Sequence, residues 1–389
     1  MSSPPGPDAG VPAVERVLVV GAGLLGTSVG LGLAAAGVPV WLTDASPRAQ
    51  ALAADLGAGT AGLPDADPTV VVVAVPTAAL SEVLQHYFHL YPHTMFTDVG
   101  SVKTQLQQYV ESLPSDLARR FVGGHPMAGR ERSGPDAARA DLFEGRTWAL
   151  TPGPQVAEEV LAVVHGLVTA LGAVPVVLTP EEHDRAVALV SHLPQVAASL
   201  VASRLADADG AALQLAGPGL LDTTRIAASD ADMWAEILRS NAGPVRAVLT
   251  ALAAELDQVV SALSRLEATG SGPDDRRGAD DSTRPSVDKS AALAQLRSVL
   301  ASGRAGRARI PGKHGGQPVR YAIVPVVIPD EPGALARLFV AAGEAGVNLE
   351  DVAIEHSPGQ PVGLVELSVA PERAEALVAA LREGGWGVH

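Results

Sequence analysis

The 389-residue chain contains no cysteine, which excludes disulfide bonds and thiolate metal sites and is typical of a protein in a reducing cytosol. Aromatic residues are also scarce, at 3% of the chain, although hydrophobic residues make up 47%. The cores must therefore be built mainly from Ala, Val and Leu. A chain of this length is expected to fold into two or three domains.

Positive charge and long apolar runs are lacking too. The chain has 28 Lys and Arg against 43 Asp and Glu, a formal net charge of -15, which argues against nucleic acid or an anionic membrane as a main partner. The apolar run VVVVAV at residues 70–75 is too short to cross a bilayer, and residues 1–12 lack the basic start and apolar stretch of a signal peptide. We therefore expect a soluble, cytoplasmic protein with a disordered lead-in over residues 1–14.

Strand-like and helical segments alternate over the first part of the chain. Strands are predicted at residues 14–20, 38–44, 69–76, 93–100, 146–152 and 173–180, and a helix at Thr27–Ala36. This alternation predicts a parallel sheet with right-handed crossovers. We therefore assign residues 15–180 to one α/β domain with a doubly wound sheet.

The pattern changes after this domain. Residues 181–268 have long helical segments and few strand signals, which predicts an all-helical domain. Residues 269–320 are rich in Gly, Pro and charge and predict a linker that contains a short helix at 289–302. Residues 321–389 show the order strand, helix, strand, strand, helix, which predicts a small α+β domain; the chain ends at WGVH, so a final strand there would be short.

A glycine fingerprint lies between the first predicted strand and the first helix. Gly21, Gly23 and Gly26 form GxGxxG, in which the glycines allow a tight turn, approach of the backbone to a pyrophosphate, and close packing of helix on strand. Asp44 ends the next strand, where a carboxylate can bind both hydroxyls of a ribose. The pattern favours a Rossmann-type dinucleotide site over a glycine-rich turn. The predicted cofactor-binding residues are Gly21, Gly23, Leu24, Leu25, Gly26, Asp44, Pro76 and Ser101.

Asp44 also bears on the choice of cofactor. Its carboxylate would repel the 2′-phosphate of NADP, which favours NAD. Arg48, four positions further on, keeps NADP as the alternative.

The stretch VGGHPMAG, Val122–Gly129, places His125 between a glycine pair and a proline, in a predicted loop. Oxidation of a hydroxyl group requires a proton acceptor, and an imidazole with an ordinary pKa of about 6.5 suits that role. The alternative is a structural loop histidine, which the residues alone favour.

Two further loops carry polar candidates. Ser101 follows a predicted strand and could hydrogen-bond a reacting hydroxyl, or it could cap a helix that begins at Val102. Arg225 could bind a carboxylate through two parallel hydrogen bonds, or it could pair with Asp222 or Asp230 at the surface.

The helical region holds His183, His192 and Gln195. His192 and Gln195 are three residues apart and share a helix face, although Pro194 should bend the helix between them. His183 and His192 are nine apart, so they should face differently and not act together. This spacing does not suit a metal site, and we expect none.

These motifs, taken together and in order, resemble the prephenate dehydrogenase family of tyrosine biosynthesis. The segments that carry the resemblance cover about residues 15–265 and are GAGLLGTSVG, TDVGSVK, GGHPMAGRERSG, ADLFEGRTWALTP, EEHDRAVALVSHLPQ and DTTRIAASDADMW. The segment RIPGKHGG resembles a stretch that precedes the last domain in many members, and residues 321–389 resemble an ACT domain, which has a ferredoxin-like α+β fold.

The resemblance implies oxidative decarboxylation of prephenate to 4-hydroxyphenylpyruvate with NAD, in a homodimer formed by the helical domain. His125 matches the catalytic histidine, Ser101 the serine that contacts the same ring hydroxyl, and Arg225 the arginine that binds a substrate carboxylate. The residues implied to bind substrate are Ser101, His125, His192, Gln195 and Arg225.

One position departs from the family pattern. Many relatives have a histidine where Gln195 stands, on the side that faces the substrate side chain, so arogenate, the amino analogue of prephenate, is the alternative substrate.

The ACT resemblance implies feedback by an aromatic amino acid, or a role in dimerisation alone. The residues implied to bind the effector are Asp330, Gly333, Ala334, Leu335 and Asn348. A different class of function would be a catalytically silent regulator that binds NAD and an amino acid. The presence of Ser101, His125 and Arg225 argues against that alternative.

Overall fold

The computed structural model describes residues 14–129, 134–268, 284–310, 321–356 and 361–389. The predicted lead-in therefore lies almost wholly outside the described residues. The chain divides into two compact units, Met1–Leu252 and Ala253–His389, each of which is described by itself.

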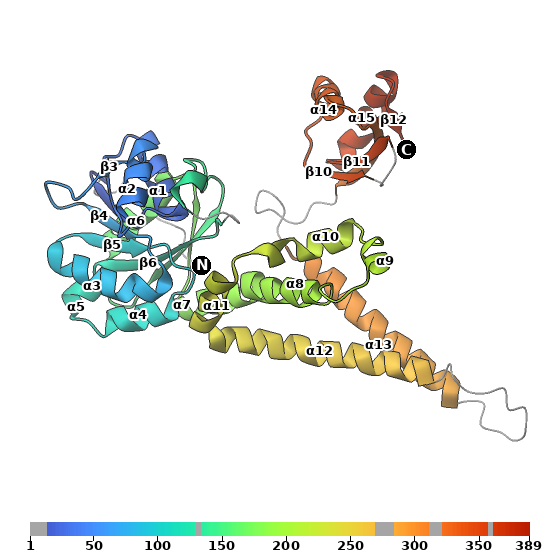
Figure 1. Cartoon of the computed structure of the whole chain (residues 1–389), viewed down its shortest axis with the longest axis horizontal. Helices are drawn as coiled ribbons and strands as arrows, with labels where there is room; N and C mark the ends of the chain where they lie inside the picture. The colour runs from blue at the N-terminus through green and yellow to red at the C-terminus, as the bar shows by residue number, and fades with distance from the viewer. Residues whose placement is uncertain (1–13, 130–133, 269–283, 311–320, 357–360) are drawn as a thin grey trace, which may run out of the picture. The chain divides into compact units, whose positions relative to one another are not determined.

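An eight-stranded sheet with the order β3-β2-β1-β4-β5-β6-β7-β8 forms the centre of the first unit (Figure 1). Its strands are β1 Val17–Val20, β2 Val40–Thr43, β3 Thr60–Ala61, β4 Val70–Val73, β5 Met95–Asp98, β6 Phe121–Pro126, β7 Thr147–Pro152 and β8 Val174–Val177. The predicted parallel sheet is confirmed except at one pair, β6 and β7, which is antiparallel. The long connection between them contains no crossover helix among the described residues, so β7 can return alongside β6 in the opposite direction.

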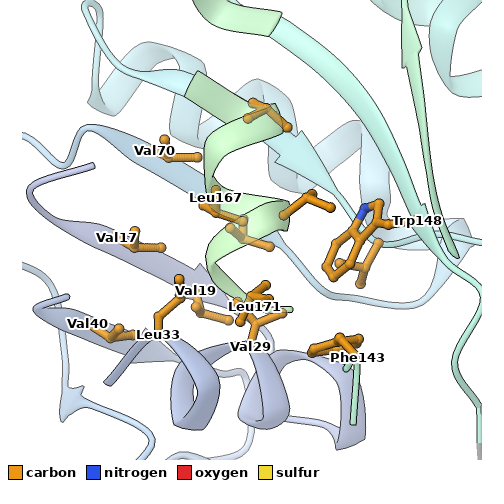
Figure 2. Close-up of a cluster of buried hydrophobic side chains, with 14 of the residues drawn as sticks. Val17, Val19, Val29, Leu33, Val40, Val70, Phe143, Trp148, Leu167 and Leu171 are labelled. Carbon is orange, nitrogen blue, oxygen red and sulfur yellow. The ribbon is translucent and has the colours of Figure 1, made fainter. Parts of the chain in front are cut away.

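Helices cover both faces of this sheet. They are α1 Leu24–Ala35, α2 Pro47–Asp55, α3 Leu80–Leu90, α4 Thr104–Glu111, α5 Ser115–Ala118 and α6 Glu158–Ala170, with the 3₁₀ turns η1 Thr77–Ala79 and η2 Pro135–Ala137. Leu33 on α1 and Leu167 on α6 pack against Val17 and Val19 of β1 (Figure 2). The alternate residues Leu18 and Val20 face the other side, so β1 is buried on both faces.

The helical part of the first unit follows directly. Its elements are α7 Pro180–Val187, η3 Ala188–His192, α8 Leu193–Ser203, α9 Gly210–Leu213, α10 Pro218–Thr224, η4 Arg225–Ala228, α11 Ala231–Ser240 and α12 Ala242–Ala268, which continues into the second unit. A capping box between Thr179 and Glu182 starts α7. The segment η3 is a π-helical turn inserted between α7 and α8, so the three form one continuous helix.

Two of these helical stretches, Pro180–Ser203 and Ala242–Ala268, are long and apolar enough to cross a membrane by length and composition alone. The sequence expectation considered only uninterrupted apolar runs and missed them. Within the first stretch, His183 and Asp184 are buried and hydrogen-bonded to residues of the sheet domain, which is packing against protein and not against lipid.

The second unit contains α13 Arg284–Arg307, which is longer than the short helix predicted at 289–302. The small domain has β9 Ala322–Pro329, α14 Ala334–Glu344, β10 Asp351–His356, β11 Val362–Val369, α15 Pro371–Glu383 and β12 Gly387–Val388. The antiparallel sheet order β10-β11-β9-β12 with two helices on one face is a ferredoxin-like arrangement, and the last strand is short as predicted.

Candidate active site

The glycine loop fits a dinucleotide. Gly21 has a φ of 106°, in the left-handed region, and a Cβ on Gly26 would lie 1.9 Å from the carbonyl oxygen of Gly21. A side chain at either position is therefore excluded. Gly23 is the N-cap of α1, no side chain caps that helix, and the space at its Cβ position is open. The first amides of α1 can therefore bind a pyrophosphate, with Leu24 and Leu25 in the first turn.

Asp44 lies beside this loop at the end of β2. Its Oδ2 accepts a hydrogen bond of 2.6 Å from the Ala22 amide, and its Oδ1 accepts one of 2.7 Å from the Ser46 amide. These bonds hold the carboxylate next to the glycine turn, where it can meet a ribose. Pro76, the N-cap of η1, follows β4 at the neighbouring strand end. The switch point between β1 and β4 is the place where such sheets bind ligands.

His125 lies within β6 and not in a loop, which corrects the sequence expectation. The two glycines before it are required by packing and not by a turn. A Cβ on Gly123 would lie 2.3 Å from Thr151 Oγ1, and one on Gly124 would lie 2.4 Å from the carbonyl oxygen of Asp98. Because β6 runs parallel to β5, His125 lies towards the same edge of the sheet as the glycine loop.

A buried ion pair holds the strand that carries His125. Lys103 is 1% exposed; its Nζ donates to Asp98 Oδ2 and, at 2.7 Å, to the carbonyl oxygen of Gly124. Asp98 Oδ1 in turn accepts from the Gly124 amide at 3.0 Å. Burial lowers the pKa of Lys103, and the charge of Asp98 opposes that shift.

His125 contacts a second histidine from α7. Its Nδ1 lies 2.9 Å from His183 Nε2, and His183 Nδ1 lies 2.8 Å from Asp184 Oδ1. Burial, together with the nearby charge of Lys103, holds the pKa of His125 well below its ordinary value. His125 is therefore neutral near pH 7 and able to accept a proton.

Asp184 links the helical part to the sheet. Its Oδ1 and Oδ2 accept hydrogen bonds of 2.8 Å from the amides of Lys103 and Thr104, at the start of α4. Burial opposes ionisation of Asp184, but hydrogen bonds from His183, Thr104 and Lys103 outweigh it and lower the pKa of the carboxyl. Because Asp184 binds these amides, and α4 begins at Thr104 with Lys103 as its N-cap, Ser101 does not cap this helix.

The π-helical turn brings His192 towards the same network. Asn241 Nδ2 donates to the carbonyl oxygen of Asp184 at 2.8 Å and to His192 Nδ1 at 3.2 Å, and the His192 ring meets Trp234 edge-on. His192 and His183 therefore share one buried network, contrary to the sequence expectation, because a π-helical turn rotates residues less than an α-helical one. Burial lowers the pKa of His192.

Gln195 is 5% exposed, and its Nε2 donates to the carbonyl oxygen of Ile226 at 3.0 Å. This bond ties α8 to η4, whose first residue is the exposed Arg225. The five predicted substrate residues therefore fall on β6, on α8 and its π turn, on η4 and on the loop before α4.

Sequence reasoning missed three members of this site, Asp98, Asp184 and Asn241, and gave Lys103 no role. It also named His183 without giving it a role. The sequence signals for Asp98 and Lys103 were weak, because an acidic residue at a strand end and a lysine in the following loop are common at the protein surface. Among the described residues no cluster of three His, Cys, Asp or Glu side chains could hold a metal ion.

A Rossmann sheet with an open glycine loop and a neutral histidine towards the same edge define a nicotinamide-dependent dehydrogenase. Two family models match the chain: "Prephenate dehydrogenase, nucleotide-binding domain" over residues 29–177 and "Prephenate dehydrogenase, dimerization domain" over residues 179–270. The chain belongs to the prephenate dehydrogenase family.

Curated relatives agree. The chain is 37% identical to a probable prephenate dehydrogenase, NovF, of Streptomyces niveus over 376 residues, covering 96% of this chain and 99% of that protein. It is 31% identical to the prephenate dehydrogenase of Lactococcus lactis, covering 59% of this chain and 65% of that protein.

Solved structures resemble it as well. The prephenate dehydrogenase from A. aeolicus, in complex with hydroxyphenyl propionate and NAD+, is 27% identical with a TM-score of 0.62, covering 76% of this chain and 99% of that one. Synechocystis arogenate dehydrogenase is 25% identical with a TM-score of 0.60, and the match covers 75% of this chain and 98% of that one. The chain is therefore an NAD-dependent oxidoreductase of tyrosine biosynthesis that acts on prephenate or arogenate.

Proposed function

We propose that the chain oxidatively decarboxylates prephenate to 4-hydroxyphenylpyruvate and that His125 is its catalytic base. The observation that carries this proposal is the position of His125, whose Nδ1 is held by His183 while its Nε2 has no hydrogen-bond partner among the described residues. Nicotinamide dehydrogenases need such a neutral acceptor at the carboxyl edge of the sheet.

Three side chains take part in this mechanism. Bound NAD+ would supply the hydride acceptor. His125 takes the proton from the hydroxyl oxygen, the carbon that bears this hydroxyl would give up a hydride to the nicotinamide, and Ser101 hydrogen-bonds the same oxygen. The ring carboxylate departs as carbon dioxide, its bonding electrons complete the aromatic ring, and His125 returns a proton to the phenolic oxygen. Arg225 binds a carboxylate of the substrate. Charge and atoms therefore balance without a metal ion.

Arogenate is the second candidate substrate, and Gln195 is the observation that favours it. Because Gln195 Nε2 is engaged by the carbonyl oxygen of Ile226, its Oε1 is the atom left to meet a substrate. An amide oxygen accepts a hydrogen bond from the ammonium of arogenate, whereas the ketone of prephenate needs a donor.

The substrate is tested by steady-state rates of NADH formation with prephenate and with arogenate. We expect turnover of prephenate with NAD, and a lower rate with NADP because of Asp44. Replacement Gln195→His removes the free amide oxygen and should raise the ratio of kcat/KM for prephenate over arogenate about 10- to 100-fold, the effect of one charge-assisted hydrogen bond.

A matched control is Gln214→His, which changes an exposed residue at the end of α9 and should leave the ratio unchanged. If the ratio of kcat/KM for prephenate over arogenate were equal in Gln195→His and wild type, Gln195 would not determine substrate specificity. No turnover of either substrate would favour the catalytically silent regulator instead.

We also propose a homodimer through the helical part. Leu252, Leu256, Val260 and Leu263 of α12 are 38–60% exposed and recur at helical spacing on one face. Such an apolar stripe on a long helix fits a second copy of the chain. Light scattering at micromolar concentration should give the mass of a dimer, and a monomer would contradict the proposal. We also propose that the chain is cytoplasmic.

The small domain is proposed to bind an aromatic amino acid as an ACT-like regulatory domain. Gly333, with a φ of 86°, starts α14 in the left-handed region, beside Asp330, Ala334 and Leu335. Asn348 donates to Glu350 at 2.8 Å and lies just before β10. Calorimetric titration of the full chain with Tyr, Phe and Trp should detect binding of one of them, and the absence of heat with all three would leave the domain a role in assembly alone.

A further inference from the structure

We propose that His183 and Asp184 are positioning residues that lock His125 in the tautomer with a bare Nε2. This inference rests on the proposed role of His125 as proton acceptor. It assigns a task to two buried side chains that do not contact the reacting atoms themselves.

The lock begins at the carboxylate. Asp184 Oδ1 accepts from the Lys103 amide and lies 2.8 Å from His183 Nδ1. An ionised carboxylate has no hydrogen to donate, so the hydrogen of this contact sits on His183 Nδ1. This lock requires the neutral form of His183, which carries one hydrogen only, so His183 Nε2 is an acceptor.

The acceptor on His183 in turn determines which nitrogen of His125 carries its hydrogen. His183 Nε2, now an acceptor, lies 2.9 Å from His125 Nδ1, so His125 Nδ1 must donate. The single hydrogen of neutral His125 is used in this contact, and its Nε2 keeps a lone pair. The reverse arrangement would leave a hydrogen on the Nε2 that has to accept the substrate proton.

Burial prevents the three side chains from rearranging. His183 is 1% exposed and Asp184 is 2% exposed, so neither can exchange its partner for water. Asp184 is also fixed by the amides of Lys103 and Thr104, and Asn241 holds its carbonyl oxygen. The orientation of His183 and Asp184 is therefore set by contacts that do not involve His125.

The charges around His125 are consistent with this arrangement. Burial, the largest cause, and the charge of Lys103 oppose its protonation, while the carboxylate of Asp184 favours it. Asp184 therefore also stabilises the imidazolium that forms when His125 takes the proton, through the intervening ring of His183.

A pair of substitutions at His183 separates positioning from packing. Gln can offer its amide nitrogen to Asp184 and its oxygen to His125 Nδ1, as the neutral ring does, whereas Leu fills similar space with no acceptor. We expect His183→Leu to lower kcat about 100-fold or more, and His183→Gln to stay within about tenfold of wild type. The KM for NAD should change little in either variant, because the glycine loop is untouched.

The tautomer itself can be observed without any variant. Nitrogen-15 NMR of histidine-labelled wild-type protein, with His125 assigned by its absence in His125→Asn, should show the hydrogen of His125 on Nδ1 and a bare Nε2. In His183→Leu the preference for Nδ1 should be lost. His165→Leu, at an exposed position of α6, is the control and should change neither the rate nor the His125 signals.

Two results would overturn the lock: a hydrogen on His125 Nε2 in the wild type, or the same kcat in His183→Leu as in wild type. Failure of the proposed function looks different. In that case wild-type protein turns over neither prephenate nor arogenate, and the NMR measurement alone decides the tautomer.

Discussion

Replacement of His125 by Asn should lower kcat about 100- to 10,000-fold and leave NAD binding within about twofold of wild type. Asparagine can still donate to His183 Nε2 from its amide, so β6 keeps its contact with α7, but it has no lone pair of suitable basicity for the hydroxyl proton. Dissociation constants for NAD, measured by fluorescence titration, separate this loss from a binding defect. A rate equal to that of wild type would disprove the assigned role.

The pH dependence of the wild-type enzyme provides an independent check on the same residue. His125 must be neutral to accept a proton, and burial together with the charge of Lys103 lowers its pKa well below the ordinary value. The acid limb of kcat/KM, which reports the free enzyme, should therefore lie below the ordinary histidine range near 6.5. An acid limb centred at or above that range would mean that the pKa of His125 is not lowered in the free enzyme.

Replacement of Lys103 by Met should destabilise the sheet domain by about 3–5 kcal/mol. The change leaves the carboxylate of Asp98 buried without its cation and removes the donor to the carbonyl oxygen of Gly124. Urea unfolding followed by tryptophan fluorescence measures the loss, since Trp148 is buried in the same domain. The double variant Asp98→Asn/Lys103→Met should recover part of it, because no unpaired charge remains.

An exposed ion pair provides the control for that experiment. Arg139 and Asp141 are 57% and 48% exposed, and Arg139→Met should leave the free energy of unfolding unchanged within the error of the measurement. Equal losses in Arg139→Met and Lys103→Met would show that the burial of the Lys103 pair has no energetic consequence.

The cofactor loop could be predicted from the sequence because its constraints are local. Gly21 and Gly26 approach each other within one turn, and Asp44 follows at a spacing set by a single strand and helix. The order of strands and helices followed from apolar periodicity for the same reason. The family resemblance then supplied roles for Ser101, His125 and Arg225 that spacing alone left open.

The support of His125 could not be predicted, because it depends on contacts between distant segments. His183 lies 58 positions from His125 in the chain, and Asp184 lies 81 positions from Lys103. No local pattern records such pairings. The glycines at 123 and 124 were misassigned to a loop because the side chains that crowd them, such as Thr151, lie on another strand.

The π-helical turn at Ala188–His192 has a consequence for how this chain can vary. A π turn holds one residue more than an α-helical turn needs, so the loss of a single residue there would restore a regular helix and rotate everything beyond it. His192 and Gln195 would then face away from Asn241 and Ile226. Insertions and deletions between α7 and α8 should therefore be absent from active members with this architecture, however freely the residue types there are exchanged.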